Sequence, residues 1–507
     1  MINEIVVVGG GTAGWITALL TQSYYPNKKI TLIESETYGI LGAGEGTFVH
    51  FLYILQRMNI KITDLVKHCD ATLKNGMRFT NWNSTSEDDW YYHPFGASSP
   101  NLGAYCINNM YHWKIPLAFC NSIYKDEHVS NVDLSSLLSE ENKVPYIFKQ
   151  KDINTDAINH FERLGTYALH FDAVKLASYL KEVAISRGIC RVEGIVDKIN
   201  TDHNDVITSL SIGDVSINCD FVFDCSGFKR LIIGNHYKTK WIEHKDKLLM
   251  NNAMPFFVEN NTNVIPSYTE ATAMKYGWIW KIPVQGRFGC GYVFNDEFTT
   301  LEDIKKEIHD KYGEVRYGKH FKFSAGAYEK VWVKNCIAIG LSCSFMEPLE
   351  ATSIFSSCKI LENALMNIED LSLMNETTME EFNNSYTKII STIVDVVSLH
   401  YITNRNDTEF WKKCKTIQPT EFNRSLLEKC KRRVLGNVDL ERDDIFGTIS
   451  FLSILEGNKL LPSNHIKNYI DELGGINPQH DDFKNKLKSA VNQSADHYEF
   501  LQYLKAN

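Results

Sequence analysis

The clearest pattern of apolar and polar positions lies at the start of the chain. Residues 4–8 (Glu-Ile-Val-Val-Val) form a β-branched run without polar alternation, which predicts a short strand buried on both faces. A glycine-rich turn follows, and the segment 15–24 is typical of a helix. Residues 29–34 (Lys-Ile-Thr-Leu-Ile-Glu) indicate a second strand. This order of strand, helix and strand predicts a βαβ unit.

The rest of the chain changes character twice. Residues 172–187 predict a helix, with Asp172 as its N-cap and Gly188 as its stop. Apolar and polar residues alternate around glycine over residues 264–294, which is typical of antiparallel sheet, and the pattern after about residue 351 is helical nearly throughout. Residues 83–160 are rich in Ser, Asn and Tyr and indicate an irregular excursion. Further strands are expected at residues 191–199, 206–212, 215–219 and 220–224.

These elements predict an α/β fold. We expect a body over residues 1–355, with a Rossmann-like dinucleotide-binding unit and an antiparallel sheet on the substrate side. Residues 356–507 are expected to form a helical cap or second subdomain that covers the substrate. The chain has only 12 prolines and no long Gly/Ser linker, so its domains are expected to be joined compactly.

Composition narrows the class of protein. The 507 residues are 44% hydrophobic and 23% charged, which is typical of a globular protein. The net charge of −9 argues against a nucleic-acid partner, because binding to phosphates needs a basic surface. No stretch reaches the roughly 18–20 apolar residues of a membrane helix, and Glu4 does not suit a signal peptide. We therefore expect a soluble, cytoplasmic protein; homo-oligomerisation stays open, because nothing in the sequence marks an interface.

Cysteine and histidine spacings point away from disulfides and metals. The 12 cysteines are scattered and no two are spaced Cys-x-x-Cys, which predicts free, buried thiols. No His-x-x-x-His pair or Cys/His cluster has the spacing of metal ligands, so no metal site is expected.

The turn after the first strand has the spacing of a dinucleotide-binding fingerprint. Gly9, Gly11 and Gly14 form a Gly-x-Gly-x-x-Gly set, in which the glycines allow a tight turn, close approach of a pyrophosphate, and packing of helix on strand. The N-terminus of the following helix supplies free N–H groups for the phosphates. Glu34, 20 residues after Gly14, is placed to accept from ribose hydroxyls. The fingerprint alone does not separate NAD from FAD.

Several further segments, in order along essentially the whole chain, resemble those of the flavin-dependent halogenases of the tryptophan-halogenase type. The most specific is Trp-Ile-Trp-Lys-Ile-Pro at residues 278–283, which is similar to the family signature Trp-x-Trp-x-Ile-Pro. The others are residues 9–15, 42–47 (Gly-Ala-Gly-Glu-Gly-Thr), 72–79, 224–228 (Asp-Cys-Ser-Gly-Phe), 347–353 (Glu-Pro-Leu-Glu-Ala-Thr-Ser), and the run of His400, Tyr401, Arg405, Asp407, Phe410 and Trp411.

The resemblance implies a flavoprotein monooxygenase-type fold that binds FAD, and halogenation of an electron-rich aromatic substrate, indole-like or phenolic. In this family reduced flavin and oxygen give a C4a-hydroperoxide, a halide ion attacks it, and the resulting hypohalous acid travels through the protein to the substrate. A separate flavin reductase supplies FADH2, and the halide is chloride, bromide or iodide. The cofactor-binding residues so indicated are Gly9, Gly11, Thr12, Ala13, Gly14, Glu34, Ala43, Gly44, Glu45 and Gly340.

The resemblance also assigns the catalytic residues. Lys74 matches the catalytic lysine, which hydrogen-bonds hypohalous acid or forms a haloamine, whereas an ordinary lysine here would extend its ammonium to water. Glu350 matches the catalytic glutamate, although the same residue could simply cap a helix. The backbone N–H groups of Thr352 and Ser353, at the start of a helix, are expected to bind the halide. If the fold brings Lys74 and Glu350 together, each compensates the charge of the other.

Aromatic residues are expected around the substrate. His93 and Phe95 match the segment that stacks on it, although such aromatic clusters are often core. Trp278 and Trp280, two residues apart on a strand, are expected to line one face and to keep the substrate away from the flavin. Phe446 and Phe451 lie in the apolar segment 445–457 of the helical cap.

Three departures from the family pattern refine the expectations. The chain has no Trp after Trp411 and its cap offers no polar clamp for an amino acid, so free tryptophan is a doubtful substrate. Ser353 stands where family members commonly carry glycine, which leaves the halide preference open. Residues 340–343 (Gly-Leu-Ser-Cys) lack the Gly-Asp or Gly-Asn found near the ribityl chain, which suggests loosely bound flavin.

Two other functions remain alternatives at this point. A flavin hydroxylase of the same fold would use the fingerprint but would need its substrate beside the flavin and no distant lysine. A flavin-binding sensor would need neither Lys74 nor Glu350, nor the two tryptophans.

Overall fold

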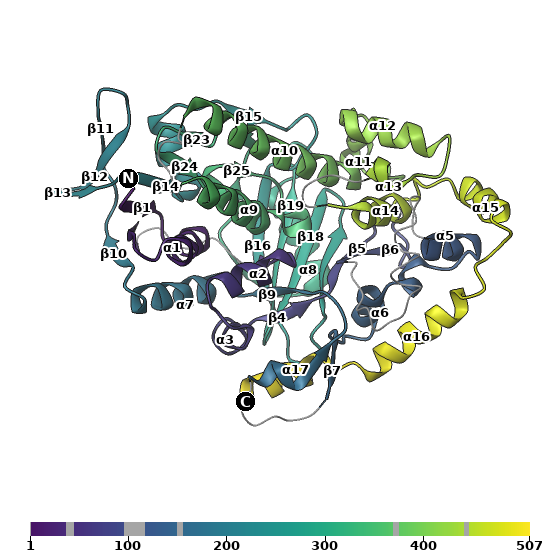
Figure 1. Ribbon diagram of the computed structural model, residues 1–507. Coiled ribbons are helices and arrows are strands. Elements are labelled where there is room, and N and C mark those ends of the chain that lie inside the picture. Colours follow the sequence, from purple (N-terminus) through teal and green to yellow (C-terminus); the bar gives the residue numbers. More distant parts are fainter. Residues whose placement is uncertain (1, 37–44, 96–116, 150–155, 369–374, 441–445) are drawn as a thin grey trace. The chain divides into compact units, whose positions relative to one another are not determined.

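The computed structural model describes residues 2–36, 45–95, 117–149, 156–368, 375–440 and 446–507 (Figure 1). These residues form two compact units, each assembled from three separate parts of the chain. Unit 1 consists of Met1–Asp70, Phe171–Lys245 and Phe323–Ser391. Unit 2 consists of Ala71–His170, Asp246–Lys322 and Thr392–Asn507. The predicted boundary at residues 355 and 356, between a body and a covering subdomain, stays a prediction.

Unit 1 is built around a mostly parallel sheet. Among the described residues its strands lie in the order β10-β2-β1-β14-β24-β23, and all neighbours are parallel except β23 and β24. The strands are β1 (Glu4–Val8), β2 (Lys29–Glu34), β10 (Cys190–Glu193), β14 (Phe221–Asp224), β23 (Trp332–Val333) and β24 (Cys336–Ala338). The predicted βαβ unit is confirmed, since β1 and β2 are parallel neighbours and α1 (Thr12–Tyr24) connects them.

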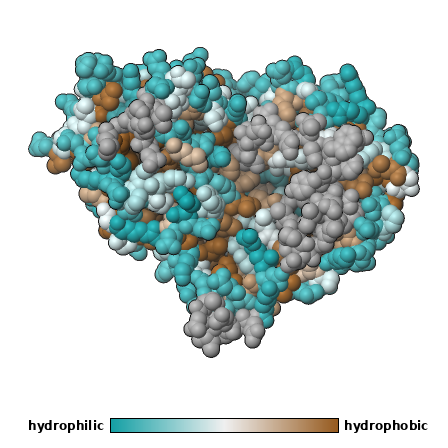
Figure 2. Space-filling model, viewed as in Figure 1, coloured by the Kyte–Doolittle hydropathy of each residue, from teal (hydrophilic) through white to brown (hydrophobic). Residues whose placement is uncertain are grey.

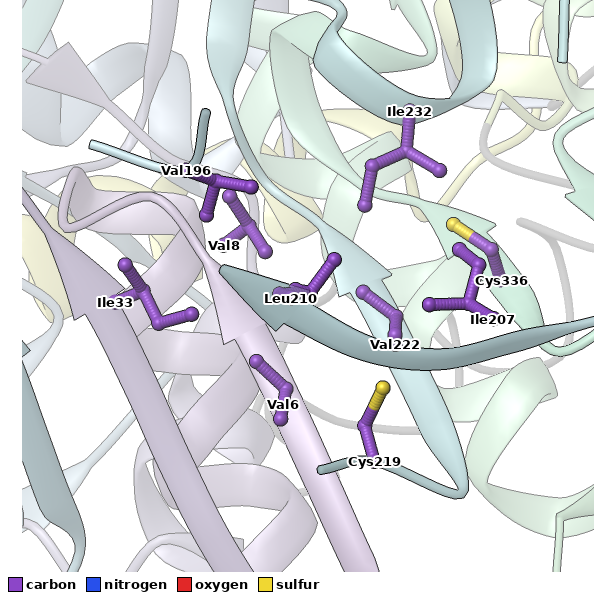
Figure 3. Packing of buried hydrophobic residues seen from close by; sticks show 10 residues of the cluster. All are labelled: Val6, Val8, Ile33, Val196, Ile207, Leu210, Cys219, Val222, Ile232 and Cys336. Atoms are coloured by element: carbon purple, nitrogen blue, oxygen red, sulfur yellow. The ribbon is translucent and has the colours of Figure 1, made fainter. Parts of the chain in front are cut away.

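The core of unit 1 explains why β1 is apolar on both faces. Val6 and Val8 pack into a buried cluster that includes Leu210 and Ile232 (Figure 3). Ile5 and Val7 are also buried and point to the opposite face, because side chains alternate along a strand. On unit 1, α1 packs against α7 (Ala173–Ser186) and α9 (Thr352–Asn367).

The remaining elements of unit 1 complete this framework. Helix α7 begins as predicted, because the Asp172 carboxylate accepts hydrogen bonds from the N–H groups of Val174 and Lys175 at 2.9 and 3.0 Å. The other helices are α2 (His50–Arg57) and α3 (Ile62–His68), with the first part of α10 (Glu376–His400). Two small antiparallel sheets are formed by β11 (Lys198–Thr201), β12 (Ile207–Ile212) and β13 (Val215–Asn218), and by β15 (Trp241–Glu243), β22 (Gly326–Tyr328) and β25 (Ser344–Phe345).

One expected strand is wrong. Residues 191–199 do not form a single strand but contribute to β10 and β11, which belong to different sheets. The break lies at Gly194, whose φ of 156° is a backbone angle that residues with a side chain rarely adopt. A Cβ there would also lie 2.4 Å from the Ile212 side chain, so the chain turns at this glycine.

Unit 2 is built around the predicted antiparallel sheet. Among the described residues its main order is β20-β16-β19-β18-β17-β5-β6, with β21 also paired to β16. The only parallel pair in this described sheet is β17 with β5. The strands are β5 (Gly76–Thr80), β6 (Trp90–Pro94), β16 (Asn252–Glu259), β17 (Tyr268–Ala273), β18 (Gly277–Val284), β19 (Arg287–Phe294), β20 (Arg316–Tyr317) and β21 (Phe321–Lys322).

Smaller elements of unit 2 bring in β4 (Thr72–Lys74), which pairs with β9 (Ala168–Phe171). The segment 83–160 is more regular than its composition indicates, since its described residues contain β6, two helices and β7 (Tyr146–Phe148), which pairs with β8 (Phe161–Arg163). The helices of unit 2 are α5 (Leu117–Tyr124), α6 (Leu134–Glu140), α8 (Leu301–Tyr312), α11 (Glu409–Cys414), α12 (Glu421–Cys430), α13 (Asn437–Leu440), α14 (Thr448–Gly457), α15 (Ser463–Glu472), α16 (His480–Gln493) and α17 (His497–Ala506).

The described chain matches the predicted helix-rich C-terminal third and the α/β class. Hydrophilic residues predominate on the face drawn in Figure 2. Within the described ranges, no helix has the length and apolar character that crossing a bilayer requires.

Candidate active site

The turn between β1 and α1 needs glycine for two separate reasons. Gly9 has a φ of 119°, and a Cβ on it would lie 2.2 Å from the carbonyl oxygen of Cys225. A Cβ on Gly14 would lie 1.9 Å from the carbonyl oxygen of Gly9, so the first turn of α1 packs directly on the end of β1. The first and third glycines therefore do what the fingerprint predicts.

Gly11, the second glycine of the fingerprint, borders open space. No described atom lies within 4 Å of where its Cβ would be, and it is the N-cap of α1 without a capping side chain from the described residues. Thr12 and Ala13 form the start of the helix beside it. Gly340, with a φ of 74°, lies against this turn, since its Cβ would be 2.8 Å from Cβ of Ala13. An uncapped helix N-terminus beside open space suits a pyrophosphate.

Glu34, at the end of β2, is held in place by two cations. Its Oε1 atom accepts from Nε of Arg191 at 2.6 Å and lies 2.8 Å from Nζ of Lys181. The other oxygen, Oε2, lies over Gly10, because a Cβ on Gly10 would be 1.8 Å from it. The carboxylate is therefore anchored through one oxygen while the other faces the glycine turn, where a ribose hydroxyl would donate.

The segment after β14 supports the same turn. Asp224 is fully buried, and its carboxylate accepts from the hydroxyl of Ser226 at 2.6 Å and from the N–H groups of Ile232 and Ile233 at 2.8 and 3.0 Å. These bonds fix the loop that presents the Cys225 carbonyl to Gly9.

Two of the predicted cofactor-binding residues, Ala43 and Gly44, lie outside the described residues. Glu45 follows them in the sequence and is described. Burial raises the pKa of its carboxyl to about 7, so the group changes charge near neutral pH.

Glu350 lies in a strained turn just before α9. The residue is buried, and both Glu350 and Ala351 have positive φ angles, 69° and 53°. Two consecutive non-glycine residues in the left-handed region cost of order 1–3 kcal/mol each, and such strain is concentrated at functional sites. Ala351, not Glu350, occupies the N-cap position of α9 and makes no side-chain capping bond.

The predicted halide site is the N-terminus of α9. This helix of 16 residues begins at Thr352 and continues through Ser353. The hydroxyls of Ser356 and Ser357 donate to the carbonyl of Ser353 at 3.1 and 2.6 Å. These two bonds use the carbonyl of Ser353 and do not involve its N–H group. A left-handed residue followed by a helix start directs successive N–H groups into a concavity that suits an anion.

Lys74 is buried at the end of β4, with no exposed surface. The alternative that its ammonium extends to water is therefore wrong. Its Nζ atom lies 5.3 Å from the centre of the Phe95 ring, a distance at which a cation and an aromatic face attract one another. A buried ammonium beside an aromatic ring is an uncommon and costly arrangement, which makes Lys74 a functional candidate.

Three of the predicted substrate residues gather in unit 2 near Lys74. His93 lies on β6, opposite Met77 of β5, and its ring centre is 6.0 Å from that of Phe446. Phe95 follows at the end of the same strand, with its N–H 3.3 Å from the carbonyl of Asn75. Phe451 packs elsewhere, against Phe422 of α12, with 5.2 Å between ring centres.

The two tryptophans of β18 share one face of the sheet. Their ring centres are 6.2 Å apart and both residues are buried. The Trp280 ring lies over Gly291 of the neighbouring strand, since a Cβ on Gly291 would come within 2.1 Å of the indole. The pair forms a continuous aromatic surface, as the alternation predicts.

A hydrogen bond joins the Lys74 strand to this tryptophan signature. The hydroxyl of Thr72 donates to the carbonyl of Pro283 at 2.7 Å. On the neighbouring segment, Nε2 of Gln285 donates to the carbonyl of Ala71 at 2.9 Å. The two sequence motifs, more than 200 residues apart, therefore share one polar connection within unit 2.

The His400 to Trp411 segment has a structural role. Arg405 forms a bidentate ion pair with Asp407, at 2.9 and 2.8 Å, and its guanidinium lies 4.5 Å from the Trp411 ring centre. Tyr91 and His400 are hydrogen-bonded at 2.7 Å. These contacts pack the segment against β5 and β6 rather than provide reactive groups.

Within unit 1 the structure brings together Gly9, Gly11, Ala13, Gly14, Glu34 and Gly340. Within unit 2 it brings together Lys74, His93, Phe95 and Phe446. Lys74 and Glu350 belong to different units, and their pairing stays a prediction.

Sequence reasoning missed several supporting residues. Arg191 and Lys181 anchor Glu34, and two buried histidines, His170 and His497, contact the Lys74 strand. The cations carry no signal in one sequence, because long-range pairing decides which carboxylate they meet. His497 stands in an amphipathic C-terminal helix, where the pattern predicts a core position and nothing more.

Comparison with known proteins gives the family of this chain. The family model described as tryptophan halogenase matches residues 4–471. The chain is 29% identical to tryptophan 7-halogenase RebH of Lentzea aerocolonigenes over 499 residues, which cover 91% of this chain and 90% of that protein. It is 27% identical to tryptophan 6-halogenase ThaL of Streptomyces albogriseolus, with coverage of 91% and 90%.

Solved structures agree as well. A tryptophan halogenase from Shewanella frigidimarina superimposes with a TM-score of 0.88 at 25% identity, over 100% of this chain and 98% of that one. The match of the family model over most of the chain, with the flavin fingerprint, the buried lysine and the tryptophan signature all in place, decides the assignment. The chain belongs to the tryptophan halogenase family and is a flavin-dependent halogenase.

Proposed function

We propose that the protein uses FADH2, oxygen and a halide ion to halogenate an electron-rich arene, indole-like or phenolic. The observation that carries this proposal is the buried Lys74 ammonium beside Phe95, in the same unit as His93 and Phe446. In the overall reaction, an arene C–H, a halide ion, a proton, O2 and FADH2 give the aryl halide, FAD and two molecules of water. The arene loses its proton and the flavin is oxidised by two electrons.

The residues of unit 1 fit FAD. Gly11 leaves room for a pyrophosphate at the N-terminus of α1, and the anchored Glu34 offers one oxygen to a ribose. When bound, reduced flavin with oxygen supplies the two-electron oxidation that makes the halide electrophilic. Thr12, Ala13 and Gly340 would border the cofactor.

Thr352 and Ser353 would hold the halide. Their N–H groups lie in the first turn of α9, which follows the left-handed turn at Glu350 and Ala351. Backbone donors suit a halide because they carry no competing anion and cannot be halogenated as an amine can.

Lys74 and Glu350 would act on the electrophile and on the substrate. The Lys74 ammonium would hydrogen-bond the oxygen of hypohalous acid or carry the halogen as a haloamine, and so would keep the oxidant from reacting indiscriminately. Glu350 would polarise the electrophile or take the proton from the halogenated ring. Its strained backbone supports a functional role for this carboxylate.

The substrate would be a neutral aromatic molecule. His93, Phe95 and Phe446 offer ring faces for stacking, and the apolar cap segment offers no clamp for an ammonium and a carboxylate. Trp278 and Trp280 would form a wall that keeps the arene from the flavin. A separate flavin reductase would supply FADH2, since the weak ribityl motif suits a cofactor that exchanges.

The hydroxylase alternative is not favoured. A hydroxylase would not need a lysine buried beside aromatic rings, and the chain belongs to a family whose members include tryptophan 6- and 7-halogenases. The sensor alternative is not favoured either, because a sensor would not need this lysine and the chain belongs to a family of enzymes.

The test is replacement of the lysine. Lys74→Ala should keep oxidising FADH2 at the rate of the unchanged protein while halogenated product falls by more than about a hundredfold. Product would be measured by mass spectrometry with a flavin reductase, FAD, a panel of indoles and phenols, and each halide in turn. Lys412→Ala, at an exposed position ion-paired to Glu409, is the matched control. Halogenation that persists in Lys74→Ala would remove Lys74 from the mechanism.

A further inference from the structure

The strand that carries Lys74 is short and lies at a sheet edge. β4 has three residues and pairs with β9 on one side, with Thr72 opposite His170, Leu73 opposite Leu169 and Lys74 opposite Ala168. An edge strand this short has few backbone bonds to hold it, so its other side needs partners of another kind.

His497, in the first turn of α17, provides one of them. The N–H of Leu73 donates to Nε2 of His497 at 2.9 Å, and Nδ1 of the same ring lies 3.0 Å from the carbonyl of Ile265. The first contact requires an unprotonated Nε2 and the second requires a proton on Nδ1, so His497 is neutral with a defined tautomer. Its side chain is fully buried.

His170 lies on β9 and contacts β4 through Thr72. The Thr72 hydroxyl gives its proton to the carbonyl of Pro283, so at 3.1 Å it can only accept from Nδ1 of His170. Nε2 of the same ring lies 2.8 Å from the hydroxyl of Thr269, which donates to it when the ring is neutral. This ring is fully buried, which favours its neutral form.

The residue after Lys74 is anchored too. The N–H of Asn75 donates to the carbonyl of Ser267 at 2.6 Å, and its side-chain amide donates to the carbonyl of Lys143 and the hydroxyl of Ser267, both at 2.9 Å. Backbone bonds at residues 73 and 75 therefore bracket Lys74.

The charge of both rings affects Lys74, because they contact the strand that carries its ammonium. Burial lowers the pKa of His170 well below its usual value, and the nearby Lys74 ammonium and His497 lower it further. Burial also lowers the pKa of His497 to about 4. A protonated ring in either place would repel the ammonium and would lose its acceptor nitrogen.

We propose that His497 and His170 are positioning residues for Lys74: two neutral imidazoles hold the edge strand so that the ammonium is delivered to the electrophile at a fixed point. This inference rests on the proposed role of Lys74. Neither ring contacts the reacting atoms; each acts through the backbone or hydroxyl of β4. A displacement of about 1 Å at a reacting group costs up to a hundredfold in rate, so loss of this support should be measurable.

The decisive experiment compares two substitutions at one position. In His497→Gln the amide oxygen stands where Nε2 was and still accepts from Leu73. In His497→Asn the amide stands where Nδ1 was, so the bond to Ile265 is kept and the bond to Leu73 is lost. We expect His497→Asn to lower halogenated product per FADH2 oxidised by about tenfold. The FADH2 oxidation rate should not change, and His497→Gln should stay within about twofold of the unchanged protein.

Tyr503→Phe controls for loosening of α17. It removes the partly buried hydrogen bond between Tyr503 of the same helix and His160, without touching β4. All variants would be measured at a temperature at which circular dichroism shows them equally folded. The proposal is overturned if the Asn and Gln variants lose product equally, or if Tyr503→Phe loses as much as His497→Asn.

A second measurement separates this inference from the proposed function. Hydrogen exchange at the Leu73 amide should quicken by more than about tenfold in His497→Asn and stay slow in His497→Gln. If exchange quickens in His497→Asn but the unchanged protein halogenates nothing, the proposed function is contradicted and the positioning role of His497 is supported. If exchange does not change, the positioning role of His497 is contradicted, whatever the activity. If His497→Asn does not fold, Thr72→Val, which removes the contacts to Pro283 and His170 but keeps the bond from Leu73 to His497, takes its place in the halogenation assay and should also lose product per FADH2 oxidised.

Discussion

Each glycine of the turn after β1 is required for a different physical reason. Gly9 has a backbone angle that side chains rarely adopt, Gly14 lies too close to the Gly9 carbonyl for a Cβ, and Gly11 leaves an open space. Gly10 also leaves no room for a Cβ, because the carboxylate of Glu34 lies directly over it. The same residue type therefore serves conformation, packing and ligand access within six positions.

This difference predicts opposite outcomes for two alanine substitutions. Gly14→Ala should destabilise the protein by about 1–3 kcal/mol, because its Cβ would overlap the Gly9 carbonyl. Gly11→Ala should change the free energy of unfolding by less than about 0.5 kcal/mol but weaken FAD binding at least about tenfold, because the methyl group fills the space for the pyrophosphate. Urea unfolding and fluorescence titration with FAD measure the two effects. Equal stability loss in both variants would contradict the assignment of that space to a ligand.

Among the elements, β4 shows how a three-residue strand acquires a defined position. Its sheet partner β9 holds one side, and α17 holds the other through a residue 424 positions away in the sequence. The β4 side chain of Thr72 adds a bond to β18 through Pro283. Three elements from distant parts of the chain thus converge on the strand that carries Lys74.

The junction of β4 and α17 should make stability depend on pH. Burial lowers the pKa of His497 to about 4, below the value near 6.5 of an unfolded histidine, while the neighbouring Asp496 opposes this shift. Between these values the unfolded chain binds a proton that the folded chain does not, so the stabilisation is complete above pH 6.5 and is lost as the pH falls towards 4. The cost at pH 4.5 should be about 2 kcal/mol.

His497→Gln removes this titration. Its free energy of unfolding should therefore fall less than that of the unchanged protein between pH 7 and pH 4.5, by about 2 kcal/mol in urea unfolding. His203→Gln, at an exposed position, is the control. If the free energy of unfolding fell by the same amount between pH 7 and pH 4.5 in the unchanged protein and in His497→Gln, the ring would take up its proton in the folded state as readily as in the unfolded chain, which contradicts the prediction.

At the scale of the whole molecule, the predicted site residues are divided between the two units. The flavin fingerprint, Glu350 and the start of α9 belong to unit 1, and Lys74 with its aromatic neighbours belongs to unit 2. Each unit draws on the N-terminal, central and C-terminal parts of the chain.

The substrate class is the prediction that belongs to this scale. We expect the protein to favour indole over L-tryptophan by at least about tenfold in kcat/KM, because the apolar segment proposed to cover the substrate would leave the buried ammonium and carboxylate of the amino acid unpaired, which is costly. Initial rates with both substrates under the same halide test this. In ¹⁸O2 the aryl halide should contain no label, whereas a hydroxylated product would carry it. Equal or better turnover of L-tryptophan would contradict the proposed substrate class.

The local pattern determined much of this protein. The βαβ unit, the bounds of β2, the cap of α7 and the antiparallel sheet follow from apolar periodicity and turn residues, because such signals act over a few positions. The glycine fingerprint and the family motifs identified the flavin residues and Lys74. The prediction of a single strand over residues 191–199 was wrong, because the chain turns at Gly194, which packs against Ile212 of another strand.

Only the tertiary structure decided what surrounds those residues. The burial of Lys74, the cations that anchor Glu34, the strained turn at Glu350 and the neutral histidines beside β4 all depend on contacts between distant parts of the chain. A sequence read by itself carries local preferences, whereas protonation states and burial are set by the neighbours that folding brings within a few ångströms. The motifs therefore supplied the candidate reactive groups, and the fold determined how they are held.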